Sequence, residues 1–571
     1  MGINMKIRYY LSNLIILPLL FSSCINLNYN EISTTDEEWV YDSPLYGVQK
    51  LVTNIYAHLQ YDFGNNMDGA MYSSATDESD YVYSLSDIHK FYNGGWSPNT
   101  PLTNTWSVAY SAIAEANTFL EKWDWVSLED YIYNEAGAGD MAYDKLVAKF
   151  EMFPYEVRFL RAYFYFELAR CYGDVPLITK SLSNVEANSV SRVPVQEVFQ
   201  YIVKECDEIA EFLPITYETE LSQEIGRASR PMVLALKART LLYAASPLFN
   251  TENDRELWKE AAKATKDLLD KANSSGISFG KYADLWGDVS YRNKEIIFGR
   301  PVGSLNYFEK NNYPVGVENG GSGNCPTQTL VDAYEYQTDG VTFGEKWSGE
   351  TVNTTANDVY AGLDPRFELT IVRNGDNWPT YNTNPIETFV GGRNGSPIYG
   401  ATTTGYYLKK YCDGTVNIST NNSNSKRHTW IIYRLAEFYL NYAEAMYQYY
   451  GDADTEGEFG MSANAAINIL RNRSDIDMPE FSGSVDFLSR YERERMVELA
   501  FEGHRFWDLR RWKKGEEMQT INVASFTKNA EGDIILNRNQ VQRGWEEKYY
   551  WFPIPFSEIQ INKNLQQNPG W

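Results

Sequence analysis

The sequence is poor in cysteine, with five in 571 residues. Cys171, Cys206, Cys325 and Cys412 stand singly, without the paired spacing that zinc and iron–sulfur ligands show. Cys171 and Cys206 fall in helical patterns, which predicts core thiols, and one disulfide among the four is left open. Residues 452–460 imitate the start of a calcium loop, but the twelfth position is Ala463, so we interpret a solvated turn. We expect no metal and no cofactor.

Positive charge is also scarce, with 51 Lys and Arg against 76 Asp and Glu, a net charge of −25. Nucleic acid and anionic membrane surfaces would repel such a chain, so the net charge argues against both classes of partner. The apolar run 11–21 is too short to span a bilayer as a helix.

That run does fit an export signal, because Lys6 and Arg8 precede it. It ends at Ser22 and Ser23 before Cys24, which is typical of a bacterial lipoprotein cleavage site. We therefore predict a signal peptide over 1–23, lipidation of Cys24 and a polar tether over 24–38. Acyl chains on Cys24 would anchor the protein, at about 0.8 kcal/mol per buried methylene.

Amphipathic patterns predict a series of helices. Their expected ranges are 47–59, 105–122, 156–172, 195–212, 231–245, 256–272, 430–450 and 463–473. Small residues such as Ala235, Ala238, Ala244 and Ala245 suit close helix crossings and resemble tetratricopeptide-type hairpins, although the period is irregular.

From 276 to 427 the composition shifts to Gly, Asn, Thr, Tyr and Pro, with short strand-like runs such as 295–299. A long irregular region inside a compact protein is usually functional or disordered. Its aromatic residues argue against disorder.

The stretch 491–512 places many charges among large rings, so some charges must be buried and paired. Glu502, His504 and Asp508 could form a catalytic group. The alternative, which we favour, is a structural ion pair between Arg505 and Asp508 that locks one helix onto another.

The same stretch, YERERMVELAFEGHRFWDLRRW, resembles the most recognisable signature of the SusD/RagB family of nutrient-binding outer-membrane lipoproteins. Four more stretches agree in the family's usual order: RFLRAYFYFELARCYGDVPLI (158–178), GRASRPMVLALKARTLLYAASPLF (226–249), RLAEFYLNYAEAM (434–446) and FPIPFSEIQINKNLQQNPGW (552–571). The resemblance implies a mainly α fold, a tetratricopeptide-like helical hairpin scaffold with a large irregular loop-rich region that carries the ligand face. We expect a helical part over 39–275 and a loop-rich insertion with the C-terminal part over 276–571, forming one compact body.

The family resemblance also implies a function. Such a lipoprotein captures oligosaccharides at the outer membrane, facing the cell exterior, and delivers them to a SusC-like TonB-dependent transporter. A RagB-like variant would capture peptides. A glycoside hydrolase would need two carboxylates about 5–10 Å apart, and no such pair, nucleophile motif or phosphate loop is identifiable. We therefore expect a binding protein rather than an enzyme.

Aromatic residues on loops are the candidates for ligand binding, because a ring can cover the C–H face of a sugar. Trp96, between Gly94-Gly95 and Pro98, is either such a stacking surface or the cap of a local core. Asp77 could accept hydroxyl bonds, although a solvated acidic loop is the alternative, and Tyr81 and Tyr83 share one face. The remaining candidates are Asn306, Tyr307, Tyr313 and Trp378, each of which is individually more typical of structure than of binding. Two or three converging rings would give millimolar to micromolar affinity.

Overall fold

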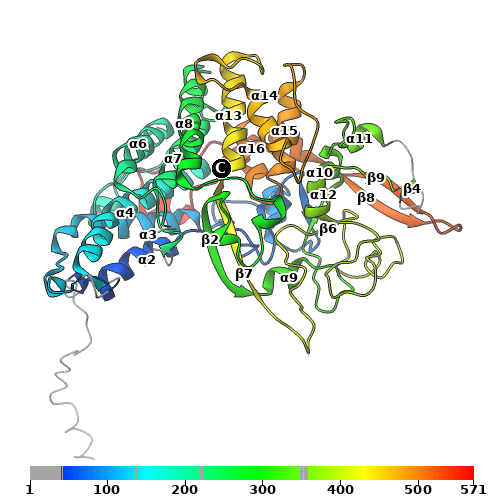
Figure 1. Ribbon diagram of the computed structural model, residues 1–571, viewed down its shortest axis with the longest axis horizontal. Helices are drawn as coiled ribbons and strands as arrows, with labels where there is room; N and C mark the ends of the chain where they lie inside the picture. The colour runs from blue at the N-terminus through cyan, green and yellow to red at the C-terminus, as the bar shows by residue number, and fades with distance from the viewer. Residues whose placement is uncertain are drawn as a thin grey trace, which may run out of the picture.

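The computed structural model describes residues 40–571 apart from 42, 136–138, 140, 218–223, 348–350 and 353–357. The predicted signal peptide, Cys24 and the tether over 24–38 lie outside the described residues. The fold is dominated by helices, as the sequence predicts, with short sheets and long irregular segments at the other end of the body (Figure 1).

Antiparallel helices stacked side by side form the scaffold. They are α2 (Gln49–Ala57), α3 (Thr105–Glu121), α4 (Tyr143–Tyr172), α6 (Val195–Ile209), α7 (Arg230–Ala245), α8 (Glu256–Ala272), α13 (Leu435–Tyr450) and α14 (Ala463–Arg471). From α3 onward each packs on the next, and α13 packs directly on α8 although the loop-rich region separates them in sequence (Figure 1). This arrangement confirms the predicted scaffold of helical hairpins.

The sequence explains how these helices begin, end and pack. Pro231 occupies the first turn of α7, where its missing N–H costs nothing. Gly173 ends α4 with φ of 71°, a conformation that favours glycine. Ala235 and Ala238 are fully buried, so neighbouring backbones approach closely there.

Two helix boundaries differ from the prediction. α4 begins at Tyr143 rather than 156 and carries Pro154 within it. The helix expected over 430–450 begins at Leu435, because the residues before it belong to strand β7 (Lys426–Arg434). That strand pairs antiparallel with β2 (Ile296–Leu305), a partner more than a hundred residues away, and β-branched residues such as Ile431 suit it.

Apart from β2, the loop-rich region holds only short elements. Its helices are α9 (Tyr307–Asn312), α10 (Gln328–Ala333), α11 (Phe343–Lys346) and α12 (Pro365–Thr370), and its strands are β3 (Asn324–Pro326), β4 (Thr351–Val352), β5 (Ile371–Val372) and β6 (Tyr407–Leu408). β3 pairs with β1 (Ser79–Tyr81), and β5 pairs with β6. The β1–β3 pair joins the N-terminal part to the insertion.

The C-terminal part adds α15 (Phe487–Glu498), α16 (His504–Arg511) and α17 (Phe556–Ile561), while α5 (Asn184–Ala187) lies in the N-terminal part. Between α16 and α17 a hairpin of β8 (Thr520–Lys528) and β9 (Ile534–Gln542) projects from the body, with the order β4-β9-β8 (Figure 1). The sequence analysis did not predict this hairpin.

The stretch 491–512 is part of a buried network of ion pairs. Glu498 accepts from Arg366, Arg434 and Arg473, and these cations hold the pKa of its carboxyl well below the ordinary range against the opposing effect of burial. Glu502 pairs with Arg434 and with Lys410, each at 2.7–2.8 Å. The network joins α15 to β7 and to the loop-rich region, which is the structural role that the sequence favoured.

The particular pair predicted in that stretch is wrong. Arg505 pairs with Asp77, at 2.7 Å between Nη2 and Oδ2, and not with Asp508. Asp508 instead accepts from Arg495 at 2.6 Å and from Arg511 at 2.9 Å. The partner of Arg505 lies 428 positions away, beyond any local pattern.

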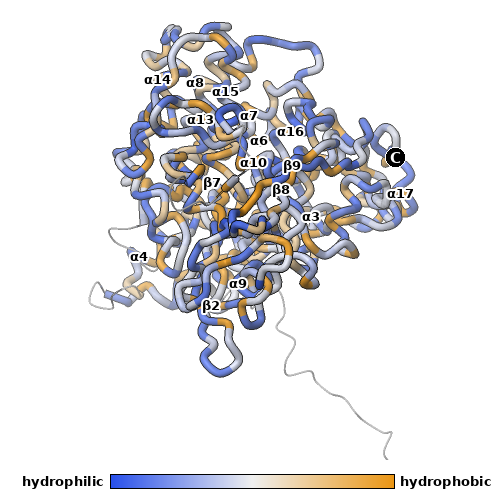
Figure 2. Tube along the Cα trace, turned by 90° about the vertical axis from the view of Figure 1, so that its right-hand side faces the viewer, coloured by the Kyte–Doolittle hydropathy of each residue, from blue (hydrophilic) through white to orange (hydrophobic). Residues whose placement is uncertain are grey.

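Apolar and polar residues alternate along the trace throughout the body (Figure 2). Within the described part of the chain, every helix is too short or too polar to cross a membrane.

The four cysteines of the body, Cys171, Cys206, Cys325 and Cys412, are buried free thiols. The disulfide that the sequence left open is therefore not formed among them.

Candidate ligand-binding site

Two tyrosines of the loop-rich region, Tyr307 and Tyr399, present their rings to solvent, and Tyr83, just after β1, lies beside Tyr399; we call these three residues the tyrosine surface. Tyr399 is 86% exposed and Tyr307 50%, while Tyr83 is half-buried. The rings of Tyr83 and Tyr399 lie 6.0 Å apart between centroids and are tilted by 53°. Such rings offer both an apolar face and a hydroxyl group.

Tyr81 lies beneath this surface and links its members. Its ring meets that of Tyr83 edge-on at 5.6 Å, so the two share a face as predicted. Burial, and next the nearby phenol of Tyr307, raise the pKa of Tyr81. Its hydroxyl donates to the carbonyl of Asp68 at 2.8 Å and to Asn311 Oδ1 at 3.1 Å. With 3% exposure, Tyr81 supports the surface from within and does not present the exposed ring that was expected.

Short elements and tight turns hold the rings in place. Tyr83 follows β1, and its hydroxyl donates to the Gly321 carbonyl at 2.8 Å. Tyr307 opens α9, next to Asn306, which donates from Nδ2 to the Asn424 carbonyl at 2.9 Å. A Cβ at Gly400 would lie 3.3 Å from the Tyr83 hydroxyl, so glycine there lets Tyr399 approach.

Asp68 is the carboxylate beside the tyrosine surface. It is exposed and adopts a φ of 50°, a left-handed conformation that Asp tolerates better than most residues. Burial, and next the Asp68 carboxylate, raise the pKa of Tyr307. Exposed rings with a carboxylate and carboxamides nearby are groups that can stack on sugar rings and bond their hydroxyls.

Trp96 does not belong to an exposed surface, and the expectation of a stacking ring there is wrong. It is 4% exposed and lies within 6 Å, between ring centroids, of Phe91, Tyr549, Phe552 and Trp571. The alternative, a cap of a local core, is what the structure shows. The C-terminal tail supplies most of the covering rings.

Three more of the predicted residues, Asp77, Tyr313 and Trp378, are also interior. Asp77 is buried in its ion pair with Arg505, so its oxygens do not face a ligand. Tyr313 is fully buried and donates to the Asp413 carbonyl at 2.6 Å. Trp378 packs edge-on against Tyr313 at 5.9 Å and beside Gly414. Among the predicted residues in the described chain, Tyr307 is exposed and Asn306 is partly exposed.

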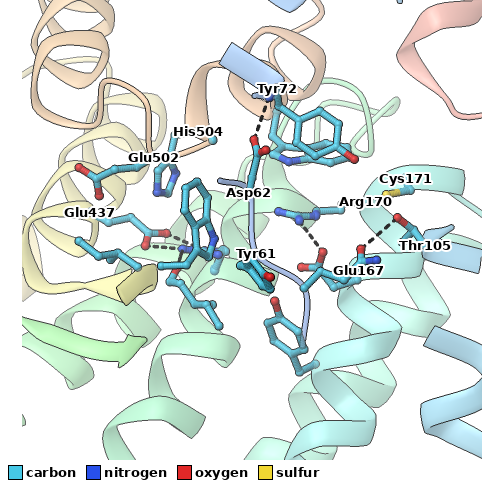
Figure 3. A pocket seen from close by; sticks show the side chains of 18 of the residues that line it. Tyr61, Asp62, Tyr72, Thr105, Glu167, Arg170, Cys171, Glu437, Glu502 and His504 are labelled. Atoms are coloured by element: carbon cyan, nitrogen blue, oxygen red, sulfur yellow. Dashed lines mark hydrogen bonds and ion pairs between the residues drawn. The ribbon is translucent and has the colours of Figure 1, made fainter. Parts of the chain in front are cut away.

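A second candidate is a charged cavity of about 80 Å³ between α4, α7, β7 and α16 (Figure 3). Glu502 and His504 line it on one side, and Glu167 and Arg170 lie opposite. Asp62 projects into it and accepts from the backbone N–H groups of Tyr72 and Gly64.

Most of the carboxylates that line this cavity form ion pairs with Arg or Lys side chains. Glu502 pairs with Arg434 and Lys410, Glu437 with Arg239, and Glu167 with Arg170. Burial, and next the charge of Arg239, hold the pKa of His504 well below its ordinary value, so the imidazole is neutral. Such pairing favours a structural role over the catalytic role of Glu502, His504 and Asp508.

Metal ligands do not cluster anywhere in the part of the chain that the structure describes. In the turn after α13, Asp452 accepts from Thr455 and Ser484, and Asp454 accepts from Asn464. These bonds close the turn with protein donors.

The sequence analysis missed Tyr399 and Asp68 and did not choose Tyr83. Tyr399 stands between Pro397 and Gly400, a setting similar to that of Trp96, and this was an available signal. The sequence around Asp68 gives no signal of this kind, because the role of Asp68 depends on Tyr81 and Tyr307, which come from other segments.

Comparisons with known proteins agree with this fold. A family model described as "SusD family" matches residues 294–571, and one described as "Starch-binding associating with outer membrane" matches residues 31–242. The SusD-like protein P2 of Formosa agariphila is 23% identical over 512 residues, covering 85% of this chain and 83% of that protein.

Two solved structures from Bacteroides fragilis are similar over nearly the whole chain. A SusD-like protein is 25% identical with a TM-score of 0.76, covering 94% of this chain and 98% of its own. A SusD-like carbohydrate-binding protein is 22% identical with a TM-score of 0.70, covering 92% and 100%. With two family models that together match most of its length, the chain belongs to the SusD/RagB family.

Proposed function

We propose that this chain captures oligosaccharides on the tyrosine surface and hands them to a SusC-like TonB-dependent transporter. The observation that carries the proposal is a group of three rings from three segments, of which Tyr307 and Tyr399 are exposed, with Asp68 and Asn306 beside them. Family membership supports a carbohydrate as the ligand, since one similar protein is described as carbohydrate-binding.

The mechanism is capture without bond cleavage. Each ring covers one sugar face, and the exposed polar groups bond hydroxyls that point sideways. Two or three such contacts give a few kcal/mol, hence a millimolar to micromolar Kd. Weak binding suits a protein that releases its cargo to a transporter.

The anchor completes the proposal. Lipidated Cys24 holds the protein on the outer membrane, facing the exterior, and the tether over 24–38 spaces the body from the lipid. Replacing Cys24 by Ser should move the protein from the membrane fraction to the soluble fraction. Persistent membrane association of that variant in the absence of any other lipid signal would contradict the anchor.

A matched pair of tyrosine variants tests the binding surface. Tyr399→Ala should weaken retention in affinity electrophoresis by about 1–3 kcal/mol, by analogy with base–aromatic stacking. Tyr133→Ala is the control, because Tyr133 is 91% exposed and lies in the segment before α4, a helix that Figure 1 shows on the side of the body away from the loop-rich region. Equal retention by both variants, on a polysaccharide that the wild-type protein retains, would remove the tyrosine surface as the site.

The alternatives are separated by two further measurements. New reducing ends during incubation with the retained polysaccharide would indicate a glycoside hydrolase and contradict capture alone. Binding of a peptide library without glycan retention would indicate the RagB-like alternative. Co-purification of the lipidated protein with a TonB-dependent barrel from outer membranes tests delivery.

A further inference from the structure

One buried arginine differs from the rest in having no carboxylate partner. Arg510, near the end of α16, is 1% exposed. In the described part of the chain, every other buried arginine pairs with a carboxylate at 3.1 Å or less. A buried charge without a counter-charge is costly, so this exception calls for a physical account.

The unpartnered atoms of Arg510 form the edge of the guanidinium that usually holds an anion. Its Nε and Nη2 are buried and lack a hydrogen-bond partner among the described residues, while Nη1 donates to the Phe506 carbonyl at 2.9 Å. Arg239 and Arg505 each use the same two atoms, Nε and Nη2, to hold one carboxylate. Two parallel N–H groups on one edge suit an anion. Arg510 therefore presents an anion-binding edge for which the described chain supplies no anion.

Aromatic rings accompany this guanidinium but do not neutralise it. Its central carbon lies 3.5 Å from the ring centroid of Phe506 and 5.4 Å from that of Trp545. Such cation–π contacts lower the cost of burying the charge and leave its sign unchanged. Burial lowers the pKa of Arg510 to about 9, so the group is still charged at neutral pH. The charge therefore remains to be balanced.

Trp545 supplies a further N–H group beside Arg510. Its indole Nε1 is buried without a partner among the described residues, although the residue as a whole is partly exposed. A Cβ at Gly515 would lie 2.6 Å from this Nε1 and 2.0 Å from Cζ2 of the same ring, so only glycine leaves this edge of the indole uncovered. The partial exposure of Trp545 places the group of donors close to solvent.

We propose that the Nε–Nη2 edge of Arg510 and the Nε1 of Trp545 together bind a small monovalent inorganic anion, for which chloride is the probe. An anion accepts from all three N–H groups and balances the guanidinium charge. A water molecule brings no charge, and its own protons need acceptors that these donors do not offer. The close packing of Gly515 against the indole favours a single-atom anion over a larger one.

The anion would fasten the C-terminal tail to α16. Trp545 follows β9, and its ring meets those of Tyr549 at 5.7 Å and Tyr550 at 5.0 Å between centroids. Tyr549 in turn stacks on Trp96 at 5.9 Å. Binding at Arg510 therefore stabilises the segment that covers Trp96. This role is separate from the capture of glycan and does not depend on it.

Chemical denaturation of the whole protein in chloride tests the site. Sodium chloride replaces sodium gluconate at constant ionic strength, so that general screening stays the same. Above half-saturation of one site, each tenfold rise in chloride should raise the folding equilibrium constant of the wild-type protein about tenfold. Arg510→Met keeps the length of the side chain without its charge and should abolish this dependence. In gluconate alone the variant should be at least as stable as the wild type, because it buries no unpaired charge.

Arg490→Met is the matched control. Arg490 also lies over a ring, with its central carbon 3.9 Å from the centroid of Phe481, but it is partly exposed and therefore hydrated. This variant should keep the full chloride dependence of the wild type. Equal dependence in all three proteins would reveal a general salt effect and overturn the proposal. A wild-type protein insensitive to chloride would overturn it as well, because the donors would then be satisfied by water.

The line width of chloride-35 in NMR measures binding to the folded protein directly. The wild type should broaden the line more than Arg510→Met does, and bromide should reverse the excess by competition. Trp545→Phe keeps a ring and removes the Nε1 donor, so it should weaken chloride binding about tenfold. Equal broadening by the wild type and Arg510→Met would overturn the site. Unchanged affinity in Trp545→Phe would overturn the assignment of Trp545 to it.

Discussion

Trp96 and Tyr399 start from similar local sequences and end in opposite environments. Each ring is flanked by glycine and proline in an irregular segment. Trp96 is covered by Tyr549, Phe552 and Trp571, which arrive from the C-terminal tail. Tyr399 meets Tyr83 on one side and remains 86% exposed. The comparison teaches that a loop setting permits exposure, whereas a distant segment decides it.

The largest expected effect is a loss of stability on replacing Trp96, and it distinguishes this buried ring from the exposed ring of Tyr399. Trp96→Ala should lower the free energy of unfolding by about 3–5 kcal/mol, because it empties a site packed by four rings. Retention of glycan by the folded protein should stay unchanged. Chemical denaturation and affinity electrophoresis measure the two quantities. If stability stayed within about 1 kcal/mol while retention fell, Trp96 would belong with the tyrosine surface after all.

Asp508→Ala is a control that should destabilise the protein without removing an aromatic ring. Its removal leaves Arg495 buried without its carboxylate partner, which should cost about 3–5 kcal/mol. Asp130→Ala, at an exposed position, should stay within about 0.5 kcal/mol. Below the unfolding transition the Asp508 variant should retain glycan normally. A parallel fall in retention would mean that stability, rather than an open ring, accounts for losses at Tyr399.

Much of the fold follows from sequence patterns, because the apolar stripes of helices such as α6 and α8 are local and repeat every three to four residues. The β8–β9 hairpin escaped prediction because the outer half of β9, from Asn537 to Gln542, is exposed and mostly polar, so the alternation typical of a half-buried strand is missing. The second half of β7, residues 430–434, was predicted as helix because its partner β2 is distant in sequence.

The site was less predictable than the fold. Tyr307, one of the predicted ligand-binding residues, has a ring open to solvent, whereas Tyr313 and Trp378, predicted in the same region, pack against each other. Asp77 looked like a loop carboxylate, and its partner Arg505 comes from the other end of the chain. Composition identifies which rings exist, whereas exposure depends on contacts between segments hundreds of residues apart.

The smallest expected effect concerns Asp62, whose segment also carries Asp68 to the tyrosine surface. Burial raises the pKa of Asp62 to about 7, against the opposing effect of the N–H groups of Tyr72 and Gly64. The ordinary value in an unfolded chain is about 3.9. Because the folded state binds this proton more tightly, the resulting stabilisation is complete below about pH 4 and is lost as the pH rises through 7.

Between pH 6 and pH 8 Asp62 should therefore reduce the free energy of unfolding by about 1.4 kcal/mol. Asp62→Asn keeps an amide oxygen for the Tyr72 N–H and removes the titration, so the variant should lose less stability over this interval. Denaturation of both proteins at the two pH values measures the difference, in which the other titrating groups cancel. If both proteins lost the same free energy of unfolding between pH 6 and pH 8, the Asp62 carboxyl would be more hydrated than its burial indicates and its pKa would not be raised. The retention of glycan by the tyrosine surface should depend only weakly on this change in stability. The segment that holds Tyr399 is different from the one that carries Asp62 and Asp68.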